Sequence, residues 1–152
     1  MRFWRICANR YASEAATGEG AALYPGRWNS RGIWVVYAST SLALAAIETF
    51  VNLKAKTQPT DLVSIEGEVP DKLEVGRIEL NRLPPSWQQP RETSLRHFGD
   101  DWIRAAQTVA LLVPSAAIGG EWNVLLNPLH PDMPHVTMPQ VEPYQFDSRL
   151  LR

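Results

Sequence analysis

The segment from Leu42 to Lys54 predicts a helix that is apolar in nearly every direction around its axis. Its polar residues fall in one sector: Glu48, Thr49 and Asn52. A helix with so little polar surface is usually buried, so the rest of the chain must pack around it. Glu48 then needs a partner or a function, because burying an unpaired charge is expensive. The residues alone leave two interpretations open, a structural glutamate paired with an arginine and a functional carboxylate.

The remaining pattern predicts one α+β domain over residues 1–152, with a mixed β-sheet core and flanking helices. Apolar and β-branched runs predict strands at 3–7, 33–37, 62–69, 109–113 and 122–126, with short strand pieces at 73–75 and 77–80. A second long helix is expected from residue 92 or 94 to residue 107, and a short helix or loop at 12–22. Three residues suit the N-cap of the first long helix: Ser39, Thr40 and Ser41.

Two proline-rich segments predict irregular structure. Residues 83–90 hold three prolines and read as a loop within the domain. The tail from Pro128 onward is expected to lie along the surface and to end in a short strand near 144–146.

Charge and composition exclude several classes of protein. The net charge of -1 argues against direct binding of nucleic acid. No apolar run reaches the length of a membrane span, and no signal peptide is apparent, so a cytoplasmic protein without membrane contact is expected. Cys7 is the one cysteine, which excludes an intrachain disulfide.

No metal site is expected, although three potential ligands cluster near the end of the chain: His130, Asp132 and His135. The prolines between them preclude a helical pair of ligands, and we expect His130 to be a structural hydrogen-bonding residue.

Five short patches contain the candidate residues for binding and catalysis: Gly26-Arg27-Trp28-Asn29, Tyr37, Glu48, Pro114-Ser115-Ala116, and Asn123 with 126–130. A loop arginine can grip phosphate as a planar fork, and Arg27 follows a turn signal at 24–26. Arg5, which also lies beside a tryptophan, is a second candidate for anion binding. A carboxylate can bind a sugar hydroxyl and face positive charge that develops on ribose.

The order of these patches and the residues within them resemble the RES domain, the toxin half of bacterial RES–Xre toxin–antitoxin pairs. The family takes its name from an arginine, a glutamate and a serine, which match Arg27, Glu48 and Ser115. The resemblance runs from about Arg5 to about Asp132. It implies a fold related to ADP-ribosyltransferases, an activity that consumes NAD+ as substrate, and a cognate Xre-type antitoxin with a helix-turn-helix domain as partner.

The resemblance also suggests a role for each residue. Arg27 and Arg5 would contact phosphate or ribose, and Tyr37 would pack against or hydrogen-bond the nicotinamide end. Glu48 would bind a ribose hydroxyl and stabilise the cation, while Ser115 would fix the Glu48 carboxylate or the ribose. Three further residues are candidates for the substrate-binding wall: Trp28, Asn29 and Asn123. For Trp28 and Asn29, a scaffold role in the loop is the alternative. No metal or bound redox cofactor is called for.

The acceptor stays open at this point. Water would make the protein a glycohydrolase, phosphate would make it a phosphorolytic enzyme, and a protein side chain would make it an ADP-ribosyltransferase. We expect NAD+ depletion, because no surface for recruiting a protein substrate is recognisable in the sequence. A non-catalytic module that binds a nucleotide or a partner is the alternative from another class, and a homodimer is also left open.

Overall fold

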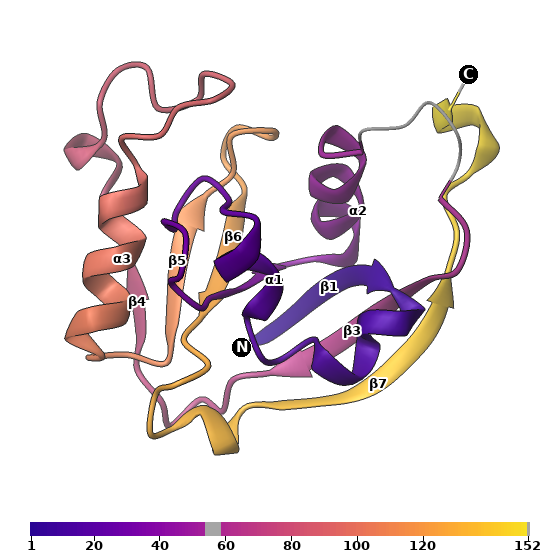
Figure 1. Ribbon diagram of the computed structural model, residues 1–152, viewed down its shortest axis with the longest axis horizontal. Helices are drawn as coiled ribbons and strands as arrows, with labels where there is room; N and C mark the ends of the chain where they lie inside the picture. The colour runs from indigo at the N-terminus through magenta and orange to yellow at the C-terminus, as the bar shows by residue number, and fades with distance from the viewer. Residues whose placement is uncertain (54–58, 152) are drawn as a thin grey trace.

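A seven-stranded mixed sheet forms the centre of the structure, a computed structural model that describes residues 1–53 and 59–151 (Figure 1). Its strands are β1 (Arg2–Ala8), β2 (Val36–Ser39), β3 (Leu62–Glu68), β4 (Val75–Arg77), β5 (Ala110–Pro114), β6 (Trp122–Leu126) and β7 (Thr137–Tyr144). The strand order is β4-β5-β6-β2-β1-β3-β7. β4 runs parallel to β5, and the other neighbours are antiparallel. The prediction of a single α+β domain with a mixed sheet and flanking helices is confirmed.

The sheet is almost divided in two between β2 and β1. These strands share one aligned pair, Trp4 with Ser39, whereas β1 and β3 align over seven pairs. One half is therefore β4-β5-β6-β2 and the other is β1-β3-β7, and the two halves diverge in Figure 1. The pocket described below opens where they meet.

In the described part of the chain, three α-helices and four short 3-10 turns flank the sheet. The helices are α1 (Glu19–Leu23), α2 (Leu42–Val51) and α3 (Arg96–Ala105), and the turns are η1 (Asn9–Glu14), η2 (Leu80–Arg82), η3 (Met133–His135) and η4 (Ser148–Leu151). Among the described residues, no helix has the length and apolar character needed to cross a membrane.

The helix α2 is less buried than its sequence predicts. It packs against β1 and buries Leu44 and Ala45, but Leu42 is 37% exposed and Val51 is 57% exposed. It begins as expected: the Ser41 hydroxyl caps it by accepting a hydrogen bond from the Leu44 amide at 3.1 Å. The predicted last residue, Lys54, lies outside the described residues. Apolar residues at both ends of the helix are therefore exposed, where the prediction placed them in the core.

The central strands are apolar because both faces of the sheet are covered. Val124 and Leu126 of β6 belong to one buried cluster, while Leu125 between them belongs to the cluster on the other face. The second cluster is closed by the segment that leads into α3, where Leu95 is fully buried. This pattern explains why 109–113 and 124–126 are continuous apolar runs.

Several predicted boundaries are wrong. The second strand covers Val36–Ser39, while 33–35 is irregular, and the two predicted pieces at 73–80 form the single short strand β4. Helix α3 begins at Arg96 and ends at Ala105, inside the predicted range. Ala105 and Ala106 are exposed, so the apolar stripe ends before them.

The tail differs most from its prediction, because 137–144 forms the long strand β7 beside β3. It contains Pro139 and Pro143, which an edge strand tolerates since one of its sides needs no ladder hydrogen bonds. Phe146, just after the strand, is buried.

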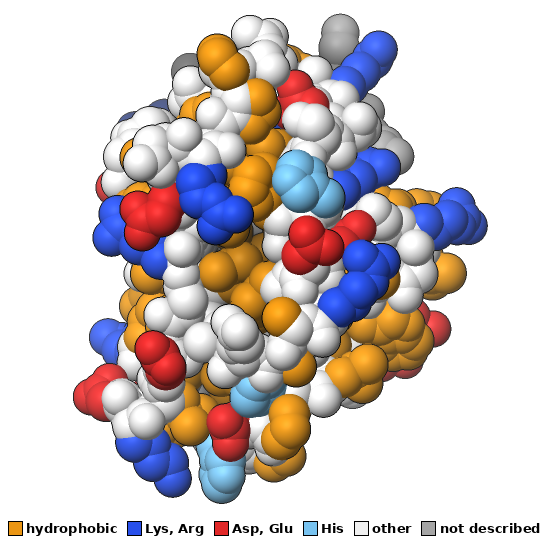
Figure 2. Space-filling model, turned by 90° about the vertical axis from the view of Figure 1, so that its left-hand side faces the viewer, with side chains coloured by type: hydrophobic (Ala, Val, Ile, Leu, Met, Phe, Trp, Pro, Cys, Tyr) orange, Lys and Arg blue, Asp and Glu red, His pale blue; other side chains and the backbone are white. Residues whose placement is uncertain are grey.

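On the face shown in Figure 2, basic and acidic side chains are interspersed around an apolar strip. The described residues on that face therefore form no continuous basic stripe of the kind that tracks a nucleic-acid backbone.

Candidate active site

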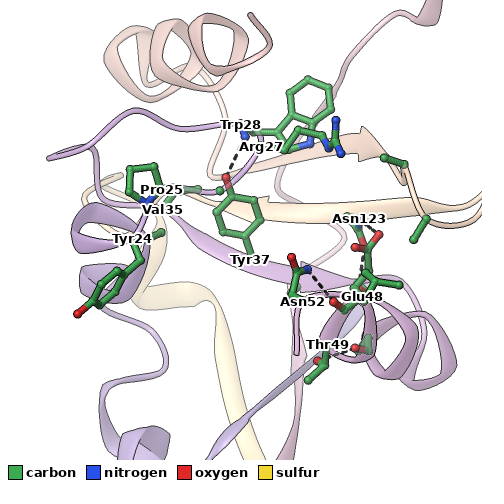
Figure 3. Close-up of a pocket in the computed structure, with 18 of the residues that line it drawn as sticks. Tyr24, Pro25, Arg27, Trp28, Val35, Tyr37, Glu48, Thr49, Asn52 and Asn123 are labelled. Carbon is green, nitrogen blue, oxygen red and sulfur yellow. Dashed lines mark hydrogen bonds between the residues drawn. The ribbon is translucent and has the colours of Figure 1, made fainter. Parts of the chain in front are cut away.

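A pocket of about 930 Å³ opens where the two halves of the sheet meet (Figure 3). Its walls come from β1, β2, α2, β6, and the loops around residues 24–28 and 88–93. Six of the eight residues predicted for the site line it: Arg5, Arg27, Trp28, Tyr37, Glu48 and Asn123. Ser115 and Asn29 do not line it, but each is hydrogen-bonded to a residue that does: Ser115 to Glu48, and Asn29 to Tyr37.

Glu48 projects from α2 and is held by two side chains from the other half of the site. The Ser115 hydroxyl and the Asn123 amide nitrogen each donate a hydrogen bond of 2.6 Å to Glu48 Oε1. Figure 3 shows Asn123 directed at the carboxylate from β6. Among the described residues, Oε2 accepts no hydrogen bond. Glu48 thus has polar partners that are neutral donors, and it forms no ion pair with any residue in 1–53 or 59–151.

Ser115 follows β5 and is almost fully buried. Its hydroxyl oxygen accepts hydrogen bonds from the backbone amides of Ala117 at 3.2 Å and Ile118 at 3.0 Å. With its acceptor side occupied in this way, its hydrogen is directed to Glu48. The geometry therefore places Ser115 as a residue that orients Glu48.

The loop that carries Arg27 is organised by the Asn29 amide, which is 1% exposed. Its nitrogen donates to the carbonyls of Ala21, Ser30 and Ile33, at 2.8, 3.2 and 3.1 Å. Its oxygen accepts from the Gly26 amide at 2.8 Å and from the Tyr37 hydroxyl at 2.8 Å. Asn29 has no free polar atom for a ligand, which favours the scaffold role.

Tyr37 closes the same network from β2. Its hydroxyl donates to Asn29 and accepts from the Trp28 amide at 3.0 Å. Burial raises the pKa of the Tyr37 phenol well above its ordinary value, so it stays protonated at neutral pH. The hydroxyl is committed to the loop, whereas the ring lines the pocket. Packing of this ring against nicotinamide stays a prediction.

Trp28 is 3% exposed and packs edge-on against Phe98 of α3, with ring centroids 6.4 Å apart. Helix α3 approaches so closely that a Cβ on Gly99 would lie 1.8 Å from the Trp28 carbonyl oxygen. This contact requires glycine and locks the loop to the helix.

Arginines give the pocket its positive charge. Arg5 Nη1 donates to the Tyr37 carbonyl at 2.8 Å, while its Nε is buried with no partner among the described residues. Burial lowers the pKa of Arg5, although a guanidinium remains charged at any physiological pH. Arg27 Nη1 donates to the carbonyls of Trp87 and Gln89, at 2.7 and 3.1 Å. Arg27 therefore also fastens the 83–90 loop, a contact that the sequence did not predict.

Two further pocket arginines, Arg91 and Arg96, were missed in the sequence. Arg96 begins α3, and its Nε donates to the Gly26 carbonyl at 3.2 Å. Arg91 has a positive φ of 64°, a backbone conformation that is uncommon for arginine. The signal for Arg96 was the polar side of the α3 pattern, which the apolar stripe at Leu95, Phe98 and Trp102 outweighed. Within 1–53 and 59–151, none of the pocket arginines forms an ion pair.

The Asn127-Pro128-Leu129-His130 patch is structural and does not line the pocket. The Asn127 side chain accepts from the Leu129 amide at 3.1 Å, and His130 Nδ1 accepts from the Asp132 amide at 3.0 Å. In the described part of the chain, no group of three His, Cys, Asp or Glu side chains is arranged to hold a metal.

Comparison with known proteins identifies the family. A family model described as "RES domain" matches residues 2–147. The chain belongs to the RES domain family. A protein of Sphingobium sp. strain YBL2, named "Prs ADP-ribosylating toxin", is 36% identical over 99% of this chain and 96% of its own length. Proteins named "Toxin Res" are 36% identical in Pseudomonas putida KT2440, over 99% of both chains, and 32% identical in Photorhabdus laumondii, over 100% of this chain and 98% of that one.

A solved structure has the same fold as this RES domain. It is titled as the M. tuberculosis MbcT-MbcA toxin-antitoxin complex, and its matched chain aligns with a TM-score of 0.72 at 16% identity. The alignment covers 99% of this chain and 86% of that chain. At this identity the likeness shows the fold.

We predict that Tyr37→Phe lowers the free energy of unfolding of the RES domain by roughly 1–3 kcal/mol. The substitution leaves the buried Trp28 amide and one acceptor site on Asn29 without their partner, which costs about that amount. Urea unfolding would measure it, with Tyr11→Phe as the control, because Tyr11 is 52% exposed. Equal stability of the two variants would contradict a stabilising role for the hydrogen bonds between the Tyr37 hydroxyl and the loop.

Proposed function

We propose that this RES domain is the toxin of a toxin–antitoxin pair and cleaves the bond between nicotinamide and ribose in NAD+. The observation that carries the proposal is Glu48, a carboxylate oriented by Ser115 and Asn123 on the wall of a pocket rich in arginine. The toxin names of the full-length relatives support the biological half of the proposal.

The oriented carboxylate suits the chemistry of this bond. When the bond breaks, its electron pair leaves with nicotinamide, which becomes neutral, and positive charge develops on the ribose. Glu48 stabilises that charge without reorganisation, because its position is set beforehand by two donors on Oε1. Oε2 is the oxygen available to a ribose hydroxyl.

The arginines suit the pyrophosphate. Arg5 is a buried cation with an unpaired Nε, and such a group gains most from an anionic ligand. The Nη1 atom of Arg27 donates to the loop carbonyls, and the other nitrogens of its guanidinium group can donate to the pyrophosphate. A volume of about 930 Å³ lies within the usual range for small-molecule sites and leaves room for a dinucleotide.

The acceptor separates two candidate functions. Water or phosphate as acceptor would deplete NAD+, the outcome expected from the sequence. Transfer to a protein side chain is favoured by the relative named "Prs ADP-ribosylating toxin", which is 36% identical over 99% of this chain. A non-catalytic module would have no need for a carboxylate that two neutral donors hold in one orientation on the wall of a pocket.

The proposal includes a cognate antitoxin as partner. The solved relative with this fold is titled a toxin-antitoxin complex. We propose an Xre-type antitoxin with a helix-turn-helix domain whose carboxylate engages the pocket arginines and excludes the pyrophosphate.

We predict that the purified protein releases nicotinamide from NAD+ and that Glu48→Gln slows the release by about 100-fold or more. The substitution keeps the size of the side chain and removes its charge. Chromatography would follow three reactions, in plain buffer, with phosphate and with a bacterial lysate, using NAD+ labelled in the adenylate. Label on protein in the lysate would indicate ADP-ribosyl transfer, and soluble ADP-ribose or its phosphate would indicate depletion.

The matched control is Glu142→Gln on the exposed strand β7, which should retain full turnover. Absence of nicotinamide in all three reactions would refute NAD+ cleavage. Wild-type turnover by Glu48→Gln would refute the role of its charge.

We further predict that the protein arrests growth of a bacterial host and that co-expression of its neighbouring Xre-type reading frame restores growth. Glu48→Gln should be tolerated by the host, because the arrest depends on catalysis. Colony counts after induction would measure both effects. Normal growth of cells that make soluble wild-type protein would count against the toxin assignment.

A further inference from the structure

Ser39 lies at the end of β2, on the far side of Asn123 from Glu48. It is 3% exposed, and its hydroxyl donates a 2.7 Å hydrogen bond to Asn123 Oδ1. The nitrogen of the same amide donates to Glu48 Oε1 at 2.6 Å. The three side chains therefore form a chain of donors that runs from Ser39 through Asn123 to the carboxylate.

The register of the sheet determines where this series of hydrogen bonds lies. Ser39 and Asn123 are directly opposed in the antiparallel pair of β2 and β6, so their side chains lie on one face of the sheet. Two residues further along, Ser41 caps α2, the helix that carries Glu48. The end of β2 thus supports both the carboxylate's helix and one of the carboxylate's donors.

The direction of the chain has a chemical consequence. An amide presents an acceptor at one end and a donor at the other, and Glu48 as a carboxylate only accepts. If the Asn123 amide turned over, its oxygen would face Oε1 and the two acceptors would repel each other. The carboxylate, which only accepts, selects the nitrogen end of the amide, and the Ser39 hydroxyl anchors the amide by donating to its oxygen on the opposite side.

Each donor on Oε1 accordingly has its own support. The backbone amides of Ala117 and Ile118 hold the Ser115 oxygen, as described above. Asn123 has no backbone group in this role among its described hydrogen bonds and depends on the Ser39 hydroxyl.

We propose that Ser39 is a positioning residue that orients the Asn123 amide and thereby fixes Glu48 for the reaction. The proposal rests on the function proposed above. Without the hydroxyl, Asn123 Oδ1 loses its partner in the pocket wall, the amide loses its fixed orientation, and Glu48 Oε1 keeps a single firm donor.

Thr40 provides a matched control. Its hydroxyl donates to the Trp122 carbonyl at 2.9 Å, so it also links the end of β2 to β6. Unlike Ser39, it has no connection to Asn123 or Glu48 in the described hydrogen bonds, and it does not line the pocket.

Steady-state kinetics test the proposal. Ser39→Ala should lower kcat for NAD+ by about tenfold with KM changed less than about twofold, the order expected for the loss of one supporting hydrogen bond in the transition state. Ser39→Thr, which keeps the hydroxyl, should restore most of kcat, and Thr40→Ala should retain it. An equal loss in Ser39→Ala and Thr40→Ala, or no recovery in Ser39→Thr, would overturn the proposal in favour of general packing.

A spectroscopic measurement separates this proposal from the proposed function. The side-chain NH₂ signals of Asn123 can be assigned in a ¹H–¹⁵N spectrum by their loss in Asn123→Ser. Ser39→Ala should shift or broaden these signals, while Thr40→Ala should leave them in place. Unchanged Asn123 signals in Ser39→Ala would overturn the orienting role. If the wild-type protein releases no nicotinamide, the proposed function fails, and the spectra still decide whether Ser39 orients Asn123.

Discussion

The hydrogen bonds to Glu48 Oε1 join parts of the molecule that are far apart in the sequence. Glu48 comes from α2, Ser115 follows β5, and Asn123 lies on β6. The two donors converge on one oxygen only when α2, the end of β5 and β6 are correctly placed relative to one another. The almost divided sheet makes this arrangement accessible, because the pocket opens at the junction where β2 and β1 share a single aligned pair.

The charges of the site are kept separate. Neutral side chains hold Glu48, and backbone carbonyls hold Arg5, Arg27 and Arg96, so no ion pair among the described residues cancels them. A ligand that carries both a pyrophosphate and a ribose that becomes positive can use both kinds of charge. Since an ion pair between arginine and Glu48 would reduce both contributions, the use of neutral partners has a direct chemical advantage.

The sequence predicts which residues form this site better than it predicts the hydrogen bonds among them. The apolar α2 pattern with one carboxylate pointed to Glu48, and the resemblance to the RES domain pointed to Arg27 and Ser115. The hydroxyl partners of Tyr37 could not be foreseen, because they depend on how the 26–29 loop folds back on β2. Arg96 was hidden by the apolar stripe of its own helix. The strand β7 was missed because prolines usually argue against a strand, and the edge position that tolerates them is set by tertiary structure.

In the proposed mechanism, the oriented carboxylate of Glu48 faces the ribose whose bond is broken. A crystal structure of Glu48→Gln with bound NAD+ tests it most directly, because the substitution slows turnover while keeping the shape of the pocket. We expect the nicotinamide ribose to lie within hydrogen-bonding distance of residue 48 and the pyrophosphate to lie against Arg5 and Arg27. NAD+ bound with that ribose remote from residue 48, or an empty pocket at NAD+ concentrations that saturate the wild-type enzyme, would contradict it.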